Sequence, residues 1–386
     1  IRVQPDGRIK LRIVEVRIHV LAGELQERFG WSLGWTKERH ATLVEVRTDS
    51  GLTGWGDGYF GGDYLLRNPD LVIGQTPFQA EAIYDSLRAA GGFQERSQPP
   101  RCGGLDMALW DLQGKALRQP LNQLLGRKYR DRVEPYCTAL YRKDCSDLAD
   151  RLADEAVEWE QQGYRTIKMK IGYGVETDLK IAGKVREALQ PRTALAVDAN
   201  CAYDAGTAAM LGRRLEPLGL AWWEEPILAN DYEGYARLRQ AFSIPLASGE
   251  SMTADELAVH YVAPRLVDIV QPDLDTVGLT GARRLTWLTW LRHQRLIPHN
   301  WGTALRTAAN LHWVATIPPV TDAVTPPPVM FELDRTEHPF RDAVLEQKID
   351  IEEDGRIAVP YWGDGLGVEV NTDKVAEFRT EHIVLK

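Results

Sequence analysis

The chain has 386 residues, 44% of them apolar and 26% charged, and its formal net charge of −9 at pH 7 argues against a nucleic-acid partner, which would need a basic surface. No apolar run approaches the roughly 18 residues of a membrane helix, and the first residues show no signal-peptide pattern, so we expect no membrane association. The four cysteines have no C-x-x-C spacing, which indicates reduced thiols in a cytoplasmic protein.

A chain of this length is too long for one ordinary hydrophobic core and suits a large barrel with a smaller domain. Residues 11–20 and 41–48 alternate like strands, and 49–51 carry a hairpin turn signal. Helices follow, the clearest within 104–115, where apolar residues recur at three- and four-residue intervals. We interpret residues 1–130 as one α+β domain.

Residues 21–39 separate the first two predicted strands and combine glycines with aromatic side chains, including Trp31 and Trp35. This composition suits a mobile lid loop that closes over a ligand. The sequence does not separate that interpretation from a loop whose tryptophans simply pack on the domain.

From Val133 onward, strands alternate strictly with amphipathic helices, which indicates a parallel α/β fold. Eight β/α units over roughly 200 residues fit a (β/α)8 barrel better than an open sheet. We expect this barrel over residues 131–340, followed by a C-terminal segment, 341–386. The predicted barrel strands are residues 133–140, 166–171, 194–198, 220–224, 245–248, 267–271, 296–299 and 329–333.

Three predicted strands end in a carboxylate, and the three acids Asp198, Glu224 and Glu250 are equally spaced in the sequence. Active-site groups of a parallel barrel lie at such strand ends. Converging carboxylates repel one another without a cation, and oxygen ligands alone favour Mg2+ over Zn2+. Strand-end acids can also cap the following helices, but the equal spacing favours a metal. Glu225 is the rival of Glu224, and strand alternation places it behind the ligands.

Lys168 and Lys170 lie on the preceding strand and share one face of it, because they are two residues apart. Each ammonium disfavours charging of the other and burial adds to this effect, so either lysine could act as a neutral base. The alternative is a solvated pair on an edge strand. The apolar neighbours Ile167, Met169 and Ile171 argue against it.

Later strand ends supply a second group of polar residues. Asp273 and His299 could form a carboxylate–imidazole pair, which fixes the tautomer and raises the basicity of the ring. Asp275 is an alternative partner for His299. Glu332 ends the last strand, where a protonated acid could hydrogen-bond a developing oxyanion. Together with a metal and the lysines, these groups suit removal of a proton α to a carboxylate.

The chain is similar to the mandelate racemase subgroup of the enolase superfamily. The motifs that carry the resemblance are residues 108–115, 168–170, 198–200, 224–226, 248–250, 271–273, His299 and 331–332. The resemblance implies a modified (β/α)8 TIM barrel and an α+β capping domain made from both chain ends, with residues 341–386 packed back on it. It also implies Mg2+ on the three carboxylates and residues 21–39 as the specificity lid.

For the chemistry, the resemblance implies that Lys170 and the His299–Asp273 dyad are the acid/base catalysts, assisted by Lys168. The absence of a lysine near residues 271–273 argues against the muconate-lactonizing subgroup. Residues 298–303 and 334–341 look most like enzymes that open acid-sugar lactones. We assign substrate contacts to Asn200, Trp301, Trp31 and Trp35.

We therefore expect a Mg2+-dependent enzyme that acts on a small acid sugar or its lactone and eliminates the β-oxygen to give a 3-deoxy-2-keto acid. A racemase or epimerase that uses the same enediolate is the alternative, and a non-catalytic binding protein is a remote one. We also expect a homo-oligomer.

Overall fold

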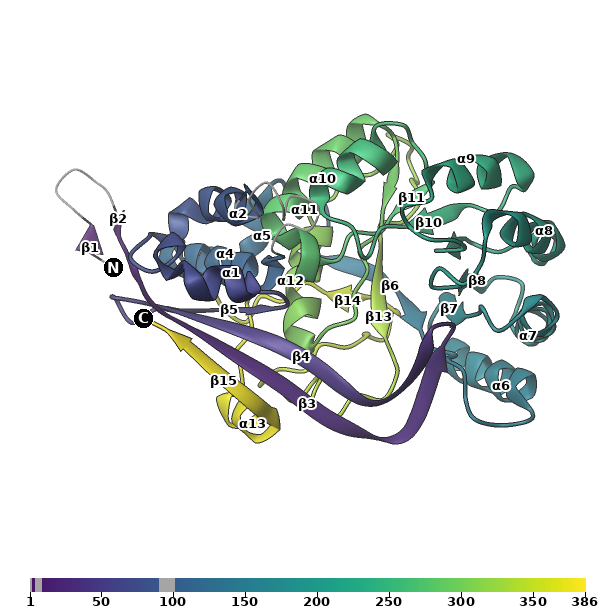
Figure 1. The fold of residues 1–386 in the computed structure, drawn as a ribbon, viewed down its shortest axis with the longest axis horizontal. Helices are drawn as coiled ribbons and strands as arrows, with labels where there is room; N and C mark the ends of the chain where they lie inside the picture. Colours follow the sequence, from purple (N-terminus) through teal and green to yellow (C-terminus); the bar gives the residue numbers. More distant parts are fainter. Residues whose placement is uncertain (1, 4–8, 90–100) are drawn as a thin grey trace.

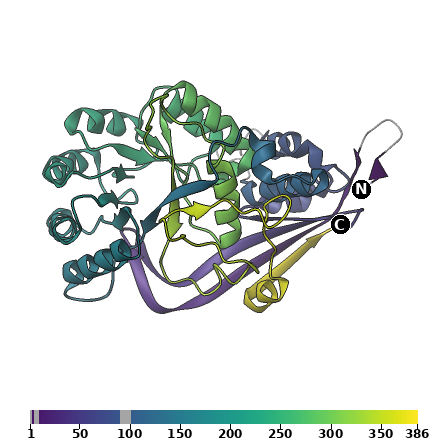
Figure 2. The ribbon, with the colours of Figure 1, turned by 180° about the vertical axis from the view of Figure 1, so that it is seen from behind.

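The computed structural model describes residues 2–3, 9–89 and 101–386, and combines a parallel barrel with an antiparallel sheet and a group of helices (Figure 1). The helices within residues 62–89 and 103–125 lie on one side of the barrel, and the connecting helices within residues 148–241 lie on the other (Figure 1). The connecting helices within residues 274–314 lie between these two groups, in contact with the first. Figure 2 shows the same arrangement from behind. Within the described part of the chain, no helix is long and apolar enough to cross a membrane.

The antiparallel sheet has the strand order β15-β3-β4-β5, so both ends of the chain contribute to it. A separate two-stranded ribbon joins β1 and β2. The strands are β1 (Arg2–Val3), β2 (Ile9–Lys10), β3 (Ile13–Trp31), β4 (Gly34–Thr48), β5 (Thr53–Asp57) and β15 (Arg379–Leu385). The helices of this part are α1 (Gly62–Arg67), η1 (Pro69–Leu71), η2 (Pro77–Gln79), α2 (Ala80–Ala89), α4 (Gly103–Leu117), α5 (Leu121–Leu125) and α13 (Thr372–Phe378).

The prediction that residues 21–39 form a loop is wrong. They continue the two strands as one long hairpin, with Leu21 paired to Ala41 and Trp31 paired to Gly34 at the tip. A register irregularity between Glu24 and Phe29 bends the hairpin. Cross-strand pairing satisfies backbone groups that a loop would leave to solvent, so most of the segment is regular strand on either side of the turn at residues 32–33.

Asp111, a buried residue of α4, connects three parts of this region. Its carboxylate accepts hydrogen bonds from the backbone N–H of Trp55 on β5 and of Leu366 in the C-terminal segment, both at 2.9 Å, and from Lys115 Nζ at 2.7 Å. One carboxylate thereby ties together the sheet, the helix and the C-terminal segment.

The barrel contains eight parallel strands in the order β12-β11-β10-β9-β8-β7-β6-β13, and β14 (Ile357–Ala358) pairs with β6 from outside this series. Seven α-helices alternate with the eight strands within residues 101–386, and irregular chain follows β13, so the barrel is a modified one. The barrel strands are β6 (Arg132–Thr138), β7 (Thr166–Lys170), β8 (Ala194–Asp198), β9 (Trp223–Glu224), β10 (Leu246–Ser248), β11 (Ile269–Val270), β12 (Arg295–Leu296) and β13 (Met330–Asp334). The helices are α6 (Leu148–Gln161), α7 (Val175–Ala188), α8 (Ala205–Leu215), η3 (Glu216–Leu218), α9 (Tyr232–Ala241), α10 (Ala254–Glu256), η4 (Leu257–Val262), α11 (Leu274–Leu291) and α12 (Ala304–Val314).

The barrel interior is filled by apolar side chains from around the ring of strands. One buried cluster contains Tyr136, Ala196, Trp222, Ala247, Ile269, Ile297 and Met330. Ile297 follows β12 and Met330 begins β13, so the first and last strands of the hydrogen-bonded series contribute to the same layer. A layer shared in this way is typical of a closed barrel and not of an open sheet. The fold is the predicted TIM barrel with a capping domain.

Candidate active site

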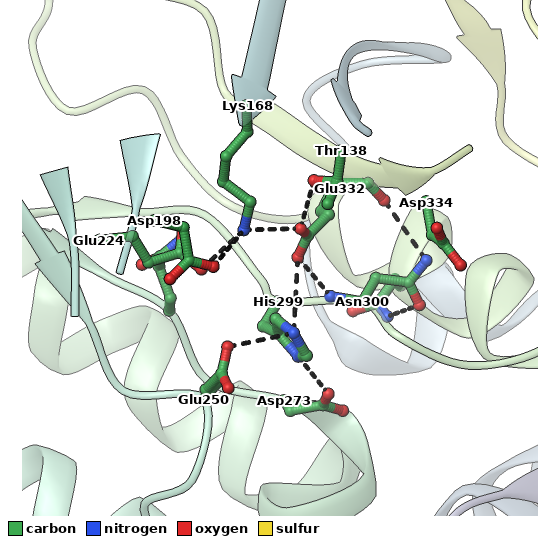
Figure 3. A network of polar contacts seen from close by, with 12 residues as sticks. Thr138, Lys168, Asp198, Glu224, Glu250, Asp273, His299, Asn300, Glu332 and Asp334 are labelled. Atoms are coloured by element: carbon green, nitrogen blue, oxygen red, sulfur yellow. Dashed lines mark hydrogen bonds and ion pairs between the residues drawn. The ribbon is translucent and has the colours of Figure 1, made fainter. Parts of the chain in front are cut away.

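The three predicted metal ligands converge at the C-terminal end of the barrel (Figure 3). Asp198 ends β8, Glu224 ends β9, and Glu250 follows β10. One carboxylate oxygen from each lies within 4.8 Å of the others, and in the described residues they are the only group of three or more His, Cys, Asp or Glu side chains with this geometry. Register explains part of this convergence, because Asp198 and Glu224 are paired neighbours on adjacent parallel strands.

This triad fits a divalent cation that prefers oxygen ligands. Oε2 of Glu250 is buried and accepts no hydrogen bond, and its polar neighbour is His299 Nε2, at 3.2 Å. The other two acids are oriented by neutral donors: Asp198 accepts from the backbone N–H of Asn200 at 2.8 Å, and Glu224 from Gln271 Nε2 at 2.7 Å. Three converging carboxylates supply the oxygen donors that Mg2+ prefers.

Lys168 and Lys170 reach the triad from the same face of β7, as their spacing predicts. Lys168 Nζ lies 2.6 Å from Glu224 Oε1, and Lys170 Nζ lies 2.5 Å from Asp198 Oδ2. Burial lowers the pKa of both lysines, but the neighbouring carboxylates outweigh it and raise both pKa values above the ordinary range. This arrangement favours the ammonium form of both lysines, and the neutral base stays a prediction. The carboxylates that face the two lysines come from neighbouring strands, so the spacing within one strand gives no sign of them.

His299 lies between the triad and Asp273. Its Nδ1 is 2.5 Å from Asp273 Oδ2, and its Nε2 is 3.2 Å from Glu250 Oε2. Burial raises the pKa of Asp273, but Arg306 and His299 outweigh it and lower that pKa to about 2. Asp275, the alternative partner, instead pairs with Arg306 at 3.2 Å.

Glu332 on β13 lies 3.9 Å from His299 Nε2 and accepts from three closer donors. Its partners are Thr138 Oγ1 at 2.5 Å, Lys168 Nζ at 2.8 Å and the backbone N–H of Asn300 at 2.9 Å. Burial raises the pKa of Glu332, but Lys168 and then His299 outweigh it, so the pKa is below its ordinary value. Glu332 is therefore an ionised acceptor, and the predicted protonated acid is incorrect.

One cavity contains most of the predicted substrate contacts. It is lined by Trp31, Tyr141, Lys170, Asn200, Glu250, His299 and Trp301. Asn200 has a left-handed φ of 41°, which asparagine tolerates, and its Oδ1 accepts from Lys170 Nζ at 2.8 Å. Trp35 is not among the lining residues: it is paired with Gly30, 37% exposed, and stacked beneath Arg28 and Arg142.

Sequence reasoning missed several residues of the site. Thr138 and Tyr141 lie at the end of the first barrel strand, where the strand-end rule could have found them. Gln271 stands two residues before Asp273, and its hydrogen bond to Glu224 was not predicted. Arg306 comes from the helix α12, and no sequence signal connects it to Asp273.

Fold and site together define a barrel enzyme whose carboxylate triad, lysines and histidine–aspartate pair gather at the strand ends. Two family models match the chain: Mandelate racemase / muconate lactonizing enzyme, N-terminal domain, over residues 14–126, and Enolase C-terminal domain-like over residues 151–374. The chain belongs to this mandelate racemase / muconate lactonizing enzyme family of the enolase superfamily.

Relatives of the chain with a named activity include acid-sugar cycloisomerases and dehydratases. The D-galactarolactone cycloisomerase of Agrobacterium fabrum is 35% identical over 96% of this chain and 99% of its own. The crystal structure of the 3,6-anhydro-D-galactonate cycloisomerase from Zobellia galactanivorans has a TM-score of 0.82 and 31% identity, covering 96% of this chain and all of the other. The crystal structure of the L-talarate/galactarate dehydratase of Salmonella typhimurium, liganded with Mg and L-lyxarohydroxamate, has a TM-score of 0.81 and 25% identity. The match covers 97% of this chain and 94% of the other. The protein is an enolase-superfamily enzyme of this kind.

Proposed function

We propose that the protein is a Mg2+-dependent enzyme that removes the proton α to the carboxylate of an acid sugar or its lactone. Elimination of the β-oxygen then gives a 3-deoxy-2-keto acid. The departing group is water in a dehydratase and the ring oxygen of the lactone in a cycloisomerase. The named relatives, which include cycloisomerases and dehydratases, support both versions.

The placement of Lys170 and His299 carries this proposal. Both side chains line one cavity together with the Glu250 carboxylate. Lys170 contacts the triad at Asp198 and His299 contacts it at Glu250. A substrate carboxylate held at the triad would therefore have an amine near one ligand and an imidazole near another, which is the geometry that acid/base chemistry at the α-carbon needs.

Each nearby side chain has a role in this scheme. Lys170 or His299 would take the α-proton, and His299 would protonate the departing β-oxygen. Asp273 would hold the Nδ1–H tautomer, so that Nε2 faces the cavity. Lys168 would assist Lys170 and the substrate carboxylate. Ionised Glu332 would hold the ammonium of Lys168 instead of donating a proton.

Asp198, Glu224 and Glu250 would hold the Mg2+, and the convergence of their carboxylate oxygens within 4.8 Å supports this assignment. When bound, the cation would supply positive charge that stabilises the developing charge on the substrate and offsets the acids that keep Lys170 protonated.

The test is a screen of aldonates, aldarates and their lactones with Mg2+, in which keto-acid formation, product mass and deuterium uptake from solvent are followed. A keto acid that is lighter than its precursor by one water identifies a dehydratase, and a product of unchanged mass a cycloisomerase. Deuterium uptake without a keto acid identifies the racemase or epimerase alternative, which the two acid/base groups also allow.

The matched variants are His299→Asn, Lys170→Ala and, as a control, His40→Asn, which changes an exposed histidine. We expect the first two to lose turnover and the control to retain it. Full activity of His299→Asn on the true substrate would contradict the two-base arrangement, and the absence of any reaction across the screen would contradict the substrate class. The cytoplasmic location and the homo-oligomer stay predictions.

A further inference from the structure

Arg306 on α12 is a buried arginine that contacts both the barrel site and the antiparallel sheet. Its Nη1 lies 3.1 Å from Asp273 Oδ1 and 3.2 Å from Asp275 Oδ2. Its Nη2 lies 2.9 Å from Oδ1 of Asp57, the last residue of β5. One guanidinium therefore joins the carboxylate beside His299 to a carboxylate of the capping domain.

Both oxygens of Asp273 are occupied, which determines the plane of this carboxylate. Oδ1 accepts from Arg306 and from the backbone N–H of Asp275 at 2.9 Å, while Oδ2 contacts His299 Nδ1. If Arg306 is removed, the Asp275 N–H alone holds Oδ1. The carboxylate could then rotate, and the imidazole ring would rotate with it.

Asp57 is as firmly held as Asp273. It is fully buried, and its Oδ2 accepts from the backbone N–H and from Oγ1 of Thr303, both at 2.7 Å. Thr303 caps the start of α12, the helix that carries Arg306, and lies four residues after His299. Asp57 thus positions the beginning of the helix and also the guanidinium that the helix presents.

Glycines bring the backbones of the capping domain and the barrel into direct contact next to this network. A Cβ at Gly58 would lie 2.7 Å from the Cα of Asp275, and a Cβ at Gly103 would lie 2.0 Å from the carbonyl oxygen of Leu274. Leu274 and Asp275 directly follow Asp273. The capping domain is therefore packed against the chain segment that carries the dyad carboxylate.

We propose that Arg306, held by Asp57, is the positioning residue of the Asp273–His299 pair, so that the capping sheet sets the orientation of the His299 ring. The inference rests on the proposed function only in giving His299 a part in the reaction. A guanidinium suits this bridge because its donors point in several fixed directions, whereas the ammonium of lysine is a single point charge.

The test compares crystal structures and kinetics of the full chain for Arg306→Met, Arg306→Lys and Asp57→Asn. Arg284→Met is the matched control, because Arg284 also joins a barrel helix to the capping domain, at Asp85, but is only half-buried and has no contact with Asp273 or His299. We expect Arg306→Met to lengthen the Nδ1–Oδ2 contact from 2.5 Å. The kcat should fall about 10- to 100-fold, with KM and Mg2+ affinity nearly unchanged.

Arg306→Lys should recover part of the lost kcat, and Arg284→Met should change neither the contact nor kcat. An Asp273–His299 contact that is unchanged in Arg306→Met overturns the inference, whatever the activity. If Arg306→Met does not fold, the inference is tested in Arg306→Lys and Asp57→Asn, where the distance between His299 Nδ1 and Asp273 Oδ2 should also lengthen. A displaced His299 ring in a protein that turns over no acid sugar would support the positioning role while contradicting the proposed function, so the two failures are distinguishable.

Discussion

The guanidinium of Arg39 on β4 donates to Asp334 Oδ2 at the end of β13 over 2.9 Å, which joins the long hairpin to the barrel. Both side chains are buried, and Arg39 also lies 4.0 Å above the ring of Trp301 in the cavity wall. The hairpin thus contacts the cavity through its own Trp31 and also through the support that Arg39 provides to Trp301.

Removal of Arg39 should destabilise the protein and loosen the cavity. Arg39→Met leaves the Asp334 carboxylate buried with less compensation, and we expect a loss of about 3 kcal/mol in the free energy of unfolding and a raised KM. Urea unfolding and steady-state kinetics measure the two effects. The control is an exposed ion pair, 2.8 Å long, between Arg151 on α6 and Glu27 on the same hairpin. Its loss in Arg151→Met should lower the free energy of unfolding by at most about 1 kcal/mol. Equal effects of the two variants would contradict this account of the hairpin.

Mg2+ should stabilise the protein through the carboxylate triad. At a concentration of about 100 times Kd, a ligand that binds only the folded state adds about 2.7 kcal/mol. We therefore expect Tm to rise with Mg2+ and to return to its original value when EDTA is added. Glu250→Gln should require a higher Mg2+ concentration for the same rise, whereas Glu233→Gln on the exposed side of α9 should behave like the parent. The same Mg2+ response in both variants would rule out Glu250 as a ligand.

His312 should make stability depend on pH. It is buried on α12, and burial lowers its pKa from 6.5 to about 4, against the effect of its hydrogen bond to the Leu366 carbonyl. A depressed folded-state pKa means that the unfolded chain binds the proton more readily, so the stability is complete above pH 6.5 and declines toward pH 4.

The free energy of unfolding should fall by about 3 kcal/mol over this range, because each unit of difference between the folded and unfolded pKa contributes about 1.4 kcal/mol. In His312→Gln the side-chain amide can still donate to the Leu366 carbonyl but cannot titrate. The share of the pH dependence of the free energy of unfolding that comes from His312 should therefore disappear. Urea unfolding at several pH values measures it, with His40→Gln as the exposed control. A slope that survives in His312→Gln would assign the pH dependence to other groups.

The contact between the capping domain and the barrel should not tolerate side chains at its glycines. Gly103→Ala places a Cβ against the Leu274 carbonyl, and we expect a loss of about 1–3 kcal/mol or more. Gly183→Ala on α7 is the control, because its Cβ would meet nothing within 4 Å, and it should stabilise the helix by up to about 1 kcal/mol. Thermal unfolding of both variants measures this difference: Tm should fall in Gly103→Ala and rise in Gly183→Ala.

The sequence by itself indicated the barrel through the number of its β/α units, and the positions of the triad through the polar residues at three strand ends. Strand ends can be recognised by their polar residues, and parallel strands bring such ends together. Asp198, Glu224 and Glu250 could therefore be predicted to meet without knowledge of any distance.

Tertiary structure decided what depends on partners from distant parts of the chain. Lys168 and Glu332 are both ionised because β7 and β13 place them 2.8 Å apart, and their local sequences contain no sign of this. The hairpin over residues 21–39 needed a pairing partner, and Arg306 needed Asp57 from another domain to become part of the site. Protonation states and bridging side chains depend on charges that only the folded chain brings into contact.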